Sequence, residues 1–241
     1  MSPPADALAP HALQQIPTLL RGEAAPIQSW IAKWSAARLG LYVAVILAGT
    51  AMFGAAVGSW RDPVQGIYTA IKFPLIVLLT TLGNGLLNGM LAPLLGTNIS
   101  FRQSLVAILM SFTIAALVLG ACSPLICFII WNTPVLSAKT ASSATTHSFI
   151  LLTVVTVIAL AGIAANVRLL QLLRQLNGSR SNARRTLFAW LAGNLLLGSQ
   201  VSWILRPFIG SPSLPIQFLR DDPLRGNFFE SVFRALQRLF S

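Results

Sequence analysis

Residues 103–138 read QSLVAILMSFTIAALVLGACSPLICFIIWNTPVLSA, a stretch without a single Asp, Glu, Lys or Arg. Four further runs are also free of these residues: 39–60, 73–101, 140–167 and 186–205. An apolar helix of about 20 residues crosses the roughly 30 Å hydrocarbon layer of a bilayer. The sequence therefore predicts an all-α fold, a polytopic membrane bundle of about five transmembrane helices, with spans at 39–60, 73–96, 104–131, 149–170 and 187–205.

The composition of the chain also indicates a membrane protein. Hydrophobic residues make up 55% of its 241 residues, charged residues only 10%, and the mean hydropathy is +0.72. In soluble domains about 25% of residues are charged. The net charge of +11 comes from basic residues at the ends of apolar runs. We therefore expect membrane lipids to be their partner and expect no binding to nucleic acid.

Amphipathic segments flank the predicted bundle at both ends. Residues 1–37 read as a disordered lead-in followed by a helix with Trp30 and Trp34 at the membrane interface, or else packed on the bundle itself. Trp203 and Arg206 are placed to anchor the end of the last span at the interface. Residues 207–241 then read as a turn-rich connector and a C-terminal amphipathic helix.

The C-terminal helix is predicted to start at Asn227. Asn227 and Glu230 have the spacing of an N-cap and a capping box. Phe229 and Phe233 belong to a broad apolar face that is opposed by basic residues. Because a soluble surface does not tolerate so large an apolar patch, we expect the helix to lie in the membrane plane with its phenylalanines covered.

Lys and Arg are concentrated in the segments that share a side with the N-terminus when five spans are assumed. These residues are Arg21, Lys33, Arg38, Arg102, Arg168, Arg174, Arg180, Arg184 and Arg185. Since basic segments remain cytoplasmic, we expect a cytoplasmic N-terminus in the inner membrane of a bacterial cell. The basic tail conflicts with this orientation, because five spans place it on the outer side of the membrane. In a four-span alternative with residues 73–96 re-entrant, the tail is inside but residues 174–185 move outside.

The loop around residues 177–185 is expected to rest on the anionic inner face of the membrane. Its three basic side chains, Arg180, Arg184 and Arg185, are predicted to contact anionic lipid.

The second predicted span carries the most polar stretch at mid-membrane depth. Its residues Gly83, Asn84, Gly85, Asn88 and Gly89 combine helix-weakening glycines with two amides one turn apart. One interpretation is a helix-packing seam, in which the amides bond to a neighbour on the fifth span. The other is a broken helix that lines a solute path.

Two polar residues of the fifth span are the expected partners in such a seam. They are Asn194 and Gln200. We favour the seam, since solute paths generally contain an ionisable group at such a site and this polar stretch offers none.

The sequence predicts that the chain is not an enzyme and binds no cofactor. No acidic residue lies within a predicted span, and both histidines, His11 and His147, lie outside them. Hydrolysis inside the membrane would need a Ser–His pair or paired carboxylates. Cys122 and Cys127 fall on different faces of one helix and read as inert thiols. No catalytic, cofactor-binding or metal-binding residue is therefore assigned.

The tail carries a distinctive pattern: W-x-L-R-P-F-x-G-S-P from Trp203, then F-x-R from Phe218 and N-F-F-E from Asn227. The pattern resembles the C-terminal part of a group of functionally uncharacterised bacterial multi-pass membrane proteins. The five-span layout is similar to that of the Yip family, which is linked to membrane trafficking and bilayer shaping. Neither resemblance transfers a catalytic or ligand residue.

The functional expectation is a non-catalytic membrane scaffold or accessory subunit of a membrane complex. Its partners would be membrane lipids together with other membrane proteins or further copies of the chain. The alternative is a small channel or carrier that uses the Gly/Asn-rich second span.

Overall fold

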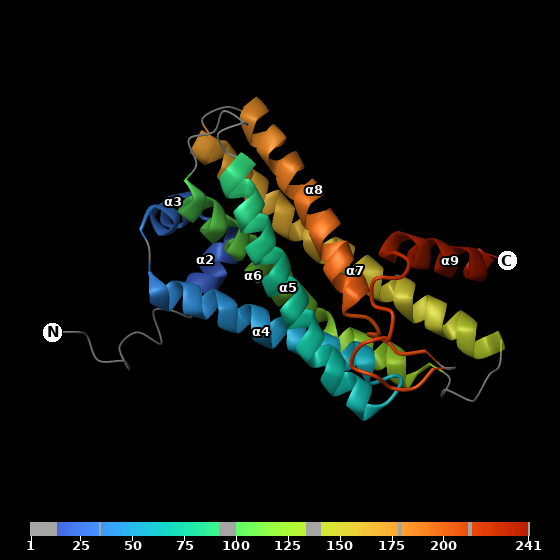
Figure 1. Cartoon of the computed structure of the whole chain (residues 1–241). Helices are drawn as coiled ribbons and strands as arrows, with labels where there is room; N and C mark the ends of the chain where they lie inside the picture. Colours follow the sequence, from blue (N-terminus) through green and yellow to red (C-terminus); the bar gives the residue numbers. More distant parts are fainter. Residues whose placement is uncertain are drawn as a thin grey trace.

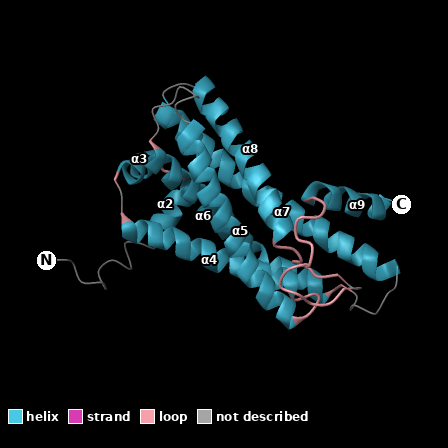
Figure 2. Cartoon of the chain, viewed as in Figure 1, coloured by secondary structure: helices cyan, strands magenta, loops and turns pink. Residues whose placement is uncertain are grey.

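The computed structural model describes residues 14–33, 35–91, 100–133, 141–177, 180–211 and 214–240. This part of the chain is built from helices and contains no strand (Figure 1, Figure 2). The helices are α2 (Gln15–Arg21), α3 (Ala24–Ala32), α4 (Ala36–Gly58), α5 (Pro63–Leu91), α6 (Phe101–Trp131), α7 (Ala141–Asn177), α8 (Arg180–Ile204) and α9 (Phe228–Phe240). Helices α4 to α8 are each long and apolar enough to cross a membrane. The predicted all-α fold is thus confirmed.

The two ends of the bundle carry different segments of the chain. Because five spans are an odd number, the segments before α4 and after α8 lie at opposite ends. We call the end with α2 and α3 the N-terminal end, and the end with residues 205–226 and α9 the tail end (Figure 1). The four-span alternative with a re-entrant second run is not observed, because α5 is one continuous helix of 29 residues.

Glycines let α4 approach its two main neighbours, α5 and α6, very closely. A methyl group on Gly49 would lie 2.3 Å from the Ala116 carbonyl oxygen of α6. Methyl groups on Gly54 and Gly58 would each lie 2.5 Å from a backbone oxygen of α5. Since real carbon atoms cannot approach so closely, these small residues are required for this packing. Gly54 and Gly58 form the G-x-x-x-G pair of the first span.

The buried side chains form two clusters, one toward each end. Leu19, Ile27 and Ile31 of the short helices join the first cluster, with side chains of α4, α6, α7 and α8. Phe53 and Ile209 belong to the second, which brings the tail connector into contact with α4 to α7. Both flanking segments are therefore parts of the folded core.

Two helices, α5 and α8, begin at least six residues before the charge-free runs that predict them. Helix α5 starts at Pro63 rather than at residue 73, because Asp62 Oδ1 accepts from the Val64 backbone N–H (2.8 Å) and proline suits a first helical turn. Helix α8 starts at Arg180, so the predicted basic loop at 177–185 is largely helical. Helix α6 continues through Pro124 to Trp131.

The N-terminal segment is also more ordered than the sequence suggests. The disordered lead-in was expected to extend to Pro17, but helix α2 already begins at Gln15. Residues 1–13 lie outside the described part of the chain. Of the two alternatives for the following helix, the structure favours packing on the bundle, since Ile27 and Ile31 of α3 are buried against it.

Candidate functional site

Three polar side chains of α5 hold the start of the tail at the tail end of the bundle. Gln65 Nε2 donates to the carbonyl oxygens of Pro207 (2.9 Å) and Phe208 (3.0 Å). Thr69 Oγ1 donates to the Phe208 oxygen (2.7 Å), and Lys72 Nζ donates to the Pro207 oxygen (2.8 Å). All three side chains are fully buried. We call this arrangement the tail clamp.

Aromatic rings complete the surroundings of the Lys72 amine. Its Nζ lies 4.8 Å from the ring centroid of Phe218 and 5.8 Å from that of Phe208. The Phe208 ring packs edge-on against Phe73, and the Phe218 ring packs edge-on against Tyr68. A cation over an aromatic face gains about 2 kcal/mol when both are desolvated. Within the described residues, this amine pairs with a carbonyl and two rings and with no carboxylate.

A second group of contacts folds the connector back on the end of α8. The Arg206 guanidinium donates to the carbonyl oxygens of Trp203 (2.8 Å), Asp222 (2.8 Å), Pro223 (2.6 Å) and Arg225 (3.0 Å). It also lies 3.9 Å from the centroid of the Trp203 ring. The indole Nε1 of Trp203 donates to the Arg225 oxygen (2.9 Å). The two predicted interfacial anchors therefore brace the tail.

The charge on Arg206 is kept despite these surroundings. Partial burial lowers the pKa of its guanidinium from the usual range, and the nearby Asp222 raises it again. An arginine starts from so high a pKa that it stays protonated at neutral pH. Arg206 is thus a permanent positive charge that is hydrogen-bonded to neutral carbonyl groups.

Lys72 was missed by the sequence prediction, because it stands just before the predicted span 73–96. Because the spans were predicted from runs without charged residues, no lysine could be placed inside one. A signal was nevertheless present, because Gln65, Thr69 and Lys72 recur at intervals of four and three residues, which places them on one face of a helix.

The predicted seam in the second span brings α5 against α8. Asn84 is fully buried, and its Nδ2 donates to Asn194 Oδ1 (2.5 Å) and to the Trp190 oxygen (3.4 Å). The structure therefore places Asn84 and Asn194 together. Gln200 is exposed and does not join them. The side chains of Asn88 and Gly89 lie outside the described part of the structure.

Small residues of the seam fit against side chains of neighbouring helices. A methyl group on Gly83 would meet Leu197 of α8 at 3.2 Å, and one on Gly85 would meet Leu105 of α6 at 2.8 Å. A methyl group on Gly193 of α8 would lie 2.6 Å from Asn84 Oδ1. These glycines therefore act in close helix packing.

The predicted interfacial residues at the two ends differ in their surroundings. Trp30 is half-buried, and Arg38 covers its ring at 5.3 Å and donates to its carbonyl oxygen (3.1 Å). Trp34 lies outside the described residues. On α9, the side chains of Phe229 and Phe233 are 51% and 60% exposed. Their apolar face is thus not covered by the described part of the chain itself.

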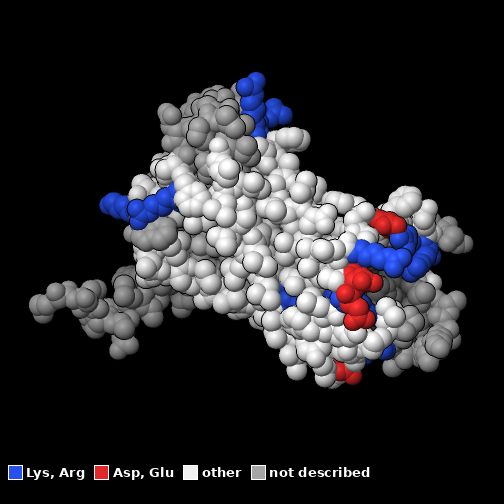
Figure 3. Space-filling model, viewed as in Figure 1, with Lys and Arg blue, Asp and Glu red and all other residues white. Residues whose placement is uncertain are grey.

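The predicted lipid-contacting arginines stand at the start of α8. Arg184 and Arg185 are exposed, and the side chain of Arg180 lies outside the described part. Figure 3 shows basic side chains protruding where α8 begins. Their position leaves them accessible to water or lipid headgroups.

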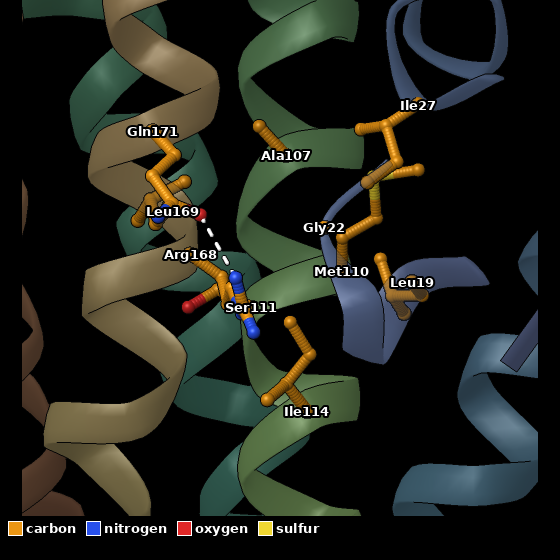
Figure 4. A pocket seen from close by; sticks show the side chains of 10 residues that line it. All are labelled: Leu19, Gly22, Ile27, Ala107, Met110, Ser111, Ile114, Arg168, Leu169 and Gln171. Atoms are coloured by element: carbon orange, nitrogen blue, oxygen red, sulfur yellow. Dashed lines mark hydrogen bonds between the residues drawn. The ribbon is translucent and has the colours of Figure 1, made fainter. Parts of the chain in front are cut away.

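A small cavity lies at the N-terminal end, between the short helices and the pair α6 and α7 (Figure 4). Its volume is about 30 Å³. Arg168 points into this region and donates a hydrogen bond to Gln171 Oε1 (3.1 Å). Most of the other side chains that line the cavity are apolar, such as Leu19 and Ile114. A space of that size holds about one water molecule and no larger ligand.

Five helices that are long and apolar enough to cross a bilayer define the chain as a multi-pass membrane protein. Comparison of the chain with protein-family models, with curated proteins and with solved structures found no match. Its function has to be inferred from its own geometry.

Proposed function

We propose that the chain is a non-catalytic integral membrane scaffold or an accessory subunit of a membrane complex. The observation that carries this proposal is how α5 uses its polar side chains. Asn84 bonds across to α8, while Gln65, Thr69 and Lys72 hold the tail. These groups form hydrogen bonds within the chain and do not converge on a ligand site. Such a use of polar side chains is expected of a structural component.

The outer surface of α8 supports the same proposal. Among the five candidate spans, α8 is the least buried. Phe188 and Leu196 are 76% and 66% exposed, and Leu195 is exposed beside them. A second membrane protein or another copy of this chain is the expected occupant of this face, with lipid covering it otherwise.

A small channel or carrier is the second candidate function. One observation favours it: the buried Oδ1 atom of Asn84 has no hydrogen-bond partner among the described residues, and a water column along α5 would supply one.

Two measurements together test these proposals. A photoreactive amino acid placed at Phe188 or Leu196 should form adducts of discrete mass with protein, whereas the matched exposed position Ile67 on α5 should label lipid. Vesicles reconstituted with the chain should show no ion or solute flux above protein-free vesicles. Flux that disappears in Asn84→Leu would establish the channel and overturn the scaffold.

We further propose that the N-terminal end is cytoplasmic and that the membrane is the inner membrane of a bacterium. The exposed arginines at the start of α8 support this orientation. Single cysteines at Ser181 and Ser143, in a variant without Cys122 and Cys127, test it with an impermeant thiol reagent on spheroplasts. The Ser143→Cys variant should be labelled and the Ser181→Cys variant protected; the reverse pattern would invert the orientation.

A further inference from the structure

A cavity of about 500 Å³ lies at the tail end, between the first turns of α7, the last turn of α8 and α9. This volume is within the range of about 300–1,000 Å³ that is usual for small-molecule sites. Four arginines line it: Arg206, Arg225, Arg234 and Arg238. Figure 3 shows basic side chains around α9 and the connector, with acidic side chains beside them. We call this space the arginine cavity.

The charges around the arginine cavity do not balance. Glu230 is the single carboxylate among its described lining residues, and it pairs with Arg234 on the next turn of α9. Arg206 donates to neutral carbonyls. Asp222 lies outside the lining but acts on Arg206, so four arginines against Glu230 and Asp222 leave a net charge of +2 from these groups. A bound anion would reduce this repulsion and accept charge-assisted hydrogen bonds.

The orientation of α9 indicates where that anion comes from. Ala235, in the face toward α7, is only 3% exposed, and Arg234 and Arg238 on the same side line the cavity. Phe229 and Phe233 point outward. In a water-soluble protein the phenylalanines would face the protein and the arginines would face the solvent. At a membrane interface it is favourable, because the rings enter the acyl chains and the guanidinium groups stay level with the lipid phosphates.

We propose that the arginine cavity binds the phosphate group of a phospholipid headgroup, while Phe229 and Phe233 on the opposite side of α9 contact acyl chains of the surrounding bilayer. The phosphodiester oxygens accept hydrogen bonds from Arg234 and Arg238, and Arg206 and Arg225 add positive potential. This binding site does not depend on the scaffold proposal, since a channel or a carrier could hold such a lipid equally well.

Titration of the full chain in an uncharged detergent tests the chemistry of the ligand. Three soluble probes are compared: short-chain phosphatidylglycerol, the phosphate-free short-chain diacylglycerol, and inorganic phosphate. The proposal expects saturable binding of phosphatidylglycerol and much weaker binding of the other two. Equal affinity for diacylglycerol would exclude recognition of phosphate, and equal affinity for inorganic phosphate would exclude a lipid as the ligand.

Single substitutions locate the binding. Arg234→Gln and Arg238→Gln should each weaken phosphatidylglycerol binding about tenfold, as expected for loss of a charge-assisted hydrogen bond. The control is Lys33→Gln, which removes one positive charge from an exposed side chain at the N-terminal end and should leave the affinity unchanged. An equal loss in this control would mean that binding follows net charge alone, and the proposal would be wrong.

A variant that gains affinity separates the proposal from damage to the fold. Glu230→Gln frees Arg234 from its carboxylate partner and removes the negative charge from the cavity. It should therefore bind phosphatidylglycerol several times more tightly. A misfolded tail cannot produce such a gain, and unchanged or weaker binding would contradict the proposal.

Discussion

The two ends of the bundle hold their flanking segments by different kinds of contact. At the N-terminal end, α2 and α3 attach through buried apolar side chains such as Leu19 and Ile31, while Arg184 and Arg185 point outward nearby. At the tail end, Lys72 points inward and Arg206 braces the connector, and both donate to backbone carbonyls. Arg38 also donates to backbone carbonyls at the N-terminal end. Among the described residues, the difference is therefore the fully buried charge of Lys72 at the tail end.

Reversing a charge tests this difference most strongly. Lys72→Glu would place a carboxylate against carbonyl oxygens and aromatic faces in a fully buried position, and should destabilise the fold by roughly 3–5 kcal/mol. The tail should then become sensitive to trypsin at Arg220 and Arg225. The matched variant Lys33→Glu changes an exposed lysine at the other end and should have little effect on thermal unfolding. Equal losses in both would remove the distinction between the ends.

Shortening a buried apolar side chain tests the N-terminal end. Ile31→Ala should cost about 2–4 kcal/mol, because a cavity replaces a buried group. Limited proteolysis should then cut near Arg21 and Lys33 and leave the tail protected. Ile67→Ala on the exposed face of α5 is the control and should leave both the digestion pattern and thermal unfolding almost unchanged.

Arg206→Gln tests the brace at the tail end. Loss of its charge-assisted bonds to carbonyls should destabilise the connector by about 2 kcal/mol. Hydrogen exchange should increase in residues 207–226 and stay constant in α2 and α3. Arg184→Gln, an equal change of charge on the surface, should change exchange in neither place.

Between the two ends, the α5–α8 seam should respond to the addition of one methyl group. Gly193→Ala would push against Asn84 Oδ1 at 2.6 Å and should cost about 1 kcal/mol. Gly162→Ala on α7 has no neighbouring atom within 4 Å and should be neutral or slightly stabilising, since alanine favours a helix. Thermal unfolding of the pair measures the difference, and identical values would show that the seam is not tightly packed.

The long apolar helices were predictable from sequence, because membrane spans require long charge-free segments. The start of α9 was predictable as well: the Asn227 side chain accepts from the Glu230 backbone N–H (2.9 Å), although the Glu230 carboxylate pairs with Arg234 and not with Asn227. The capping box at Ser100 and Gln103, which starts α6, was not noticed.

The tail clamp was beyond prediction for a physical reason. Lys72 can be buried only because carbonyls of Pro207 and rings from the connector meet it, and these are contributed by residues more than a hundred positions later. Periodicity along one helix reveals a polar face, but not which distant segment will cover it. The same limit applies to the orientation of α9, whose amphipathic pattern does not specify which face turns toward α7.

The tail clamp also has a consequence for biosynthesis. A ribosome makes α5 well before residues 207 and 208, so the nascent helix enters the membrane with Lys72 still unpartnered. A lysine opposes the insertion of an isolated membrane helix, by about 2.5–3.5 kcal/mol at the bilayer centre and by less toward the interface. The completed tail removes this penalty only after translation has passed α8. A chain that ended before the connector would leave the Lys72 amine without the Pro207 carbonyl and the two aromatic rings that now surround it.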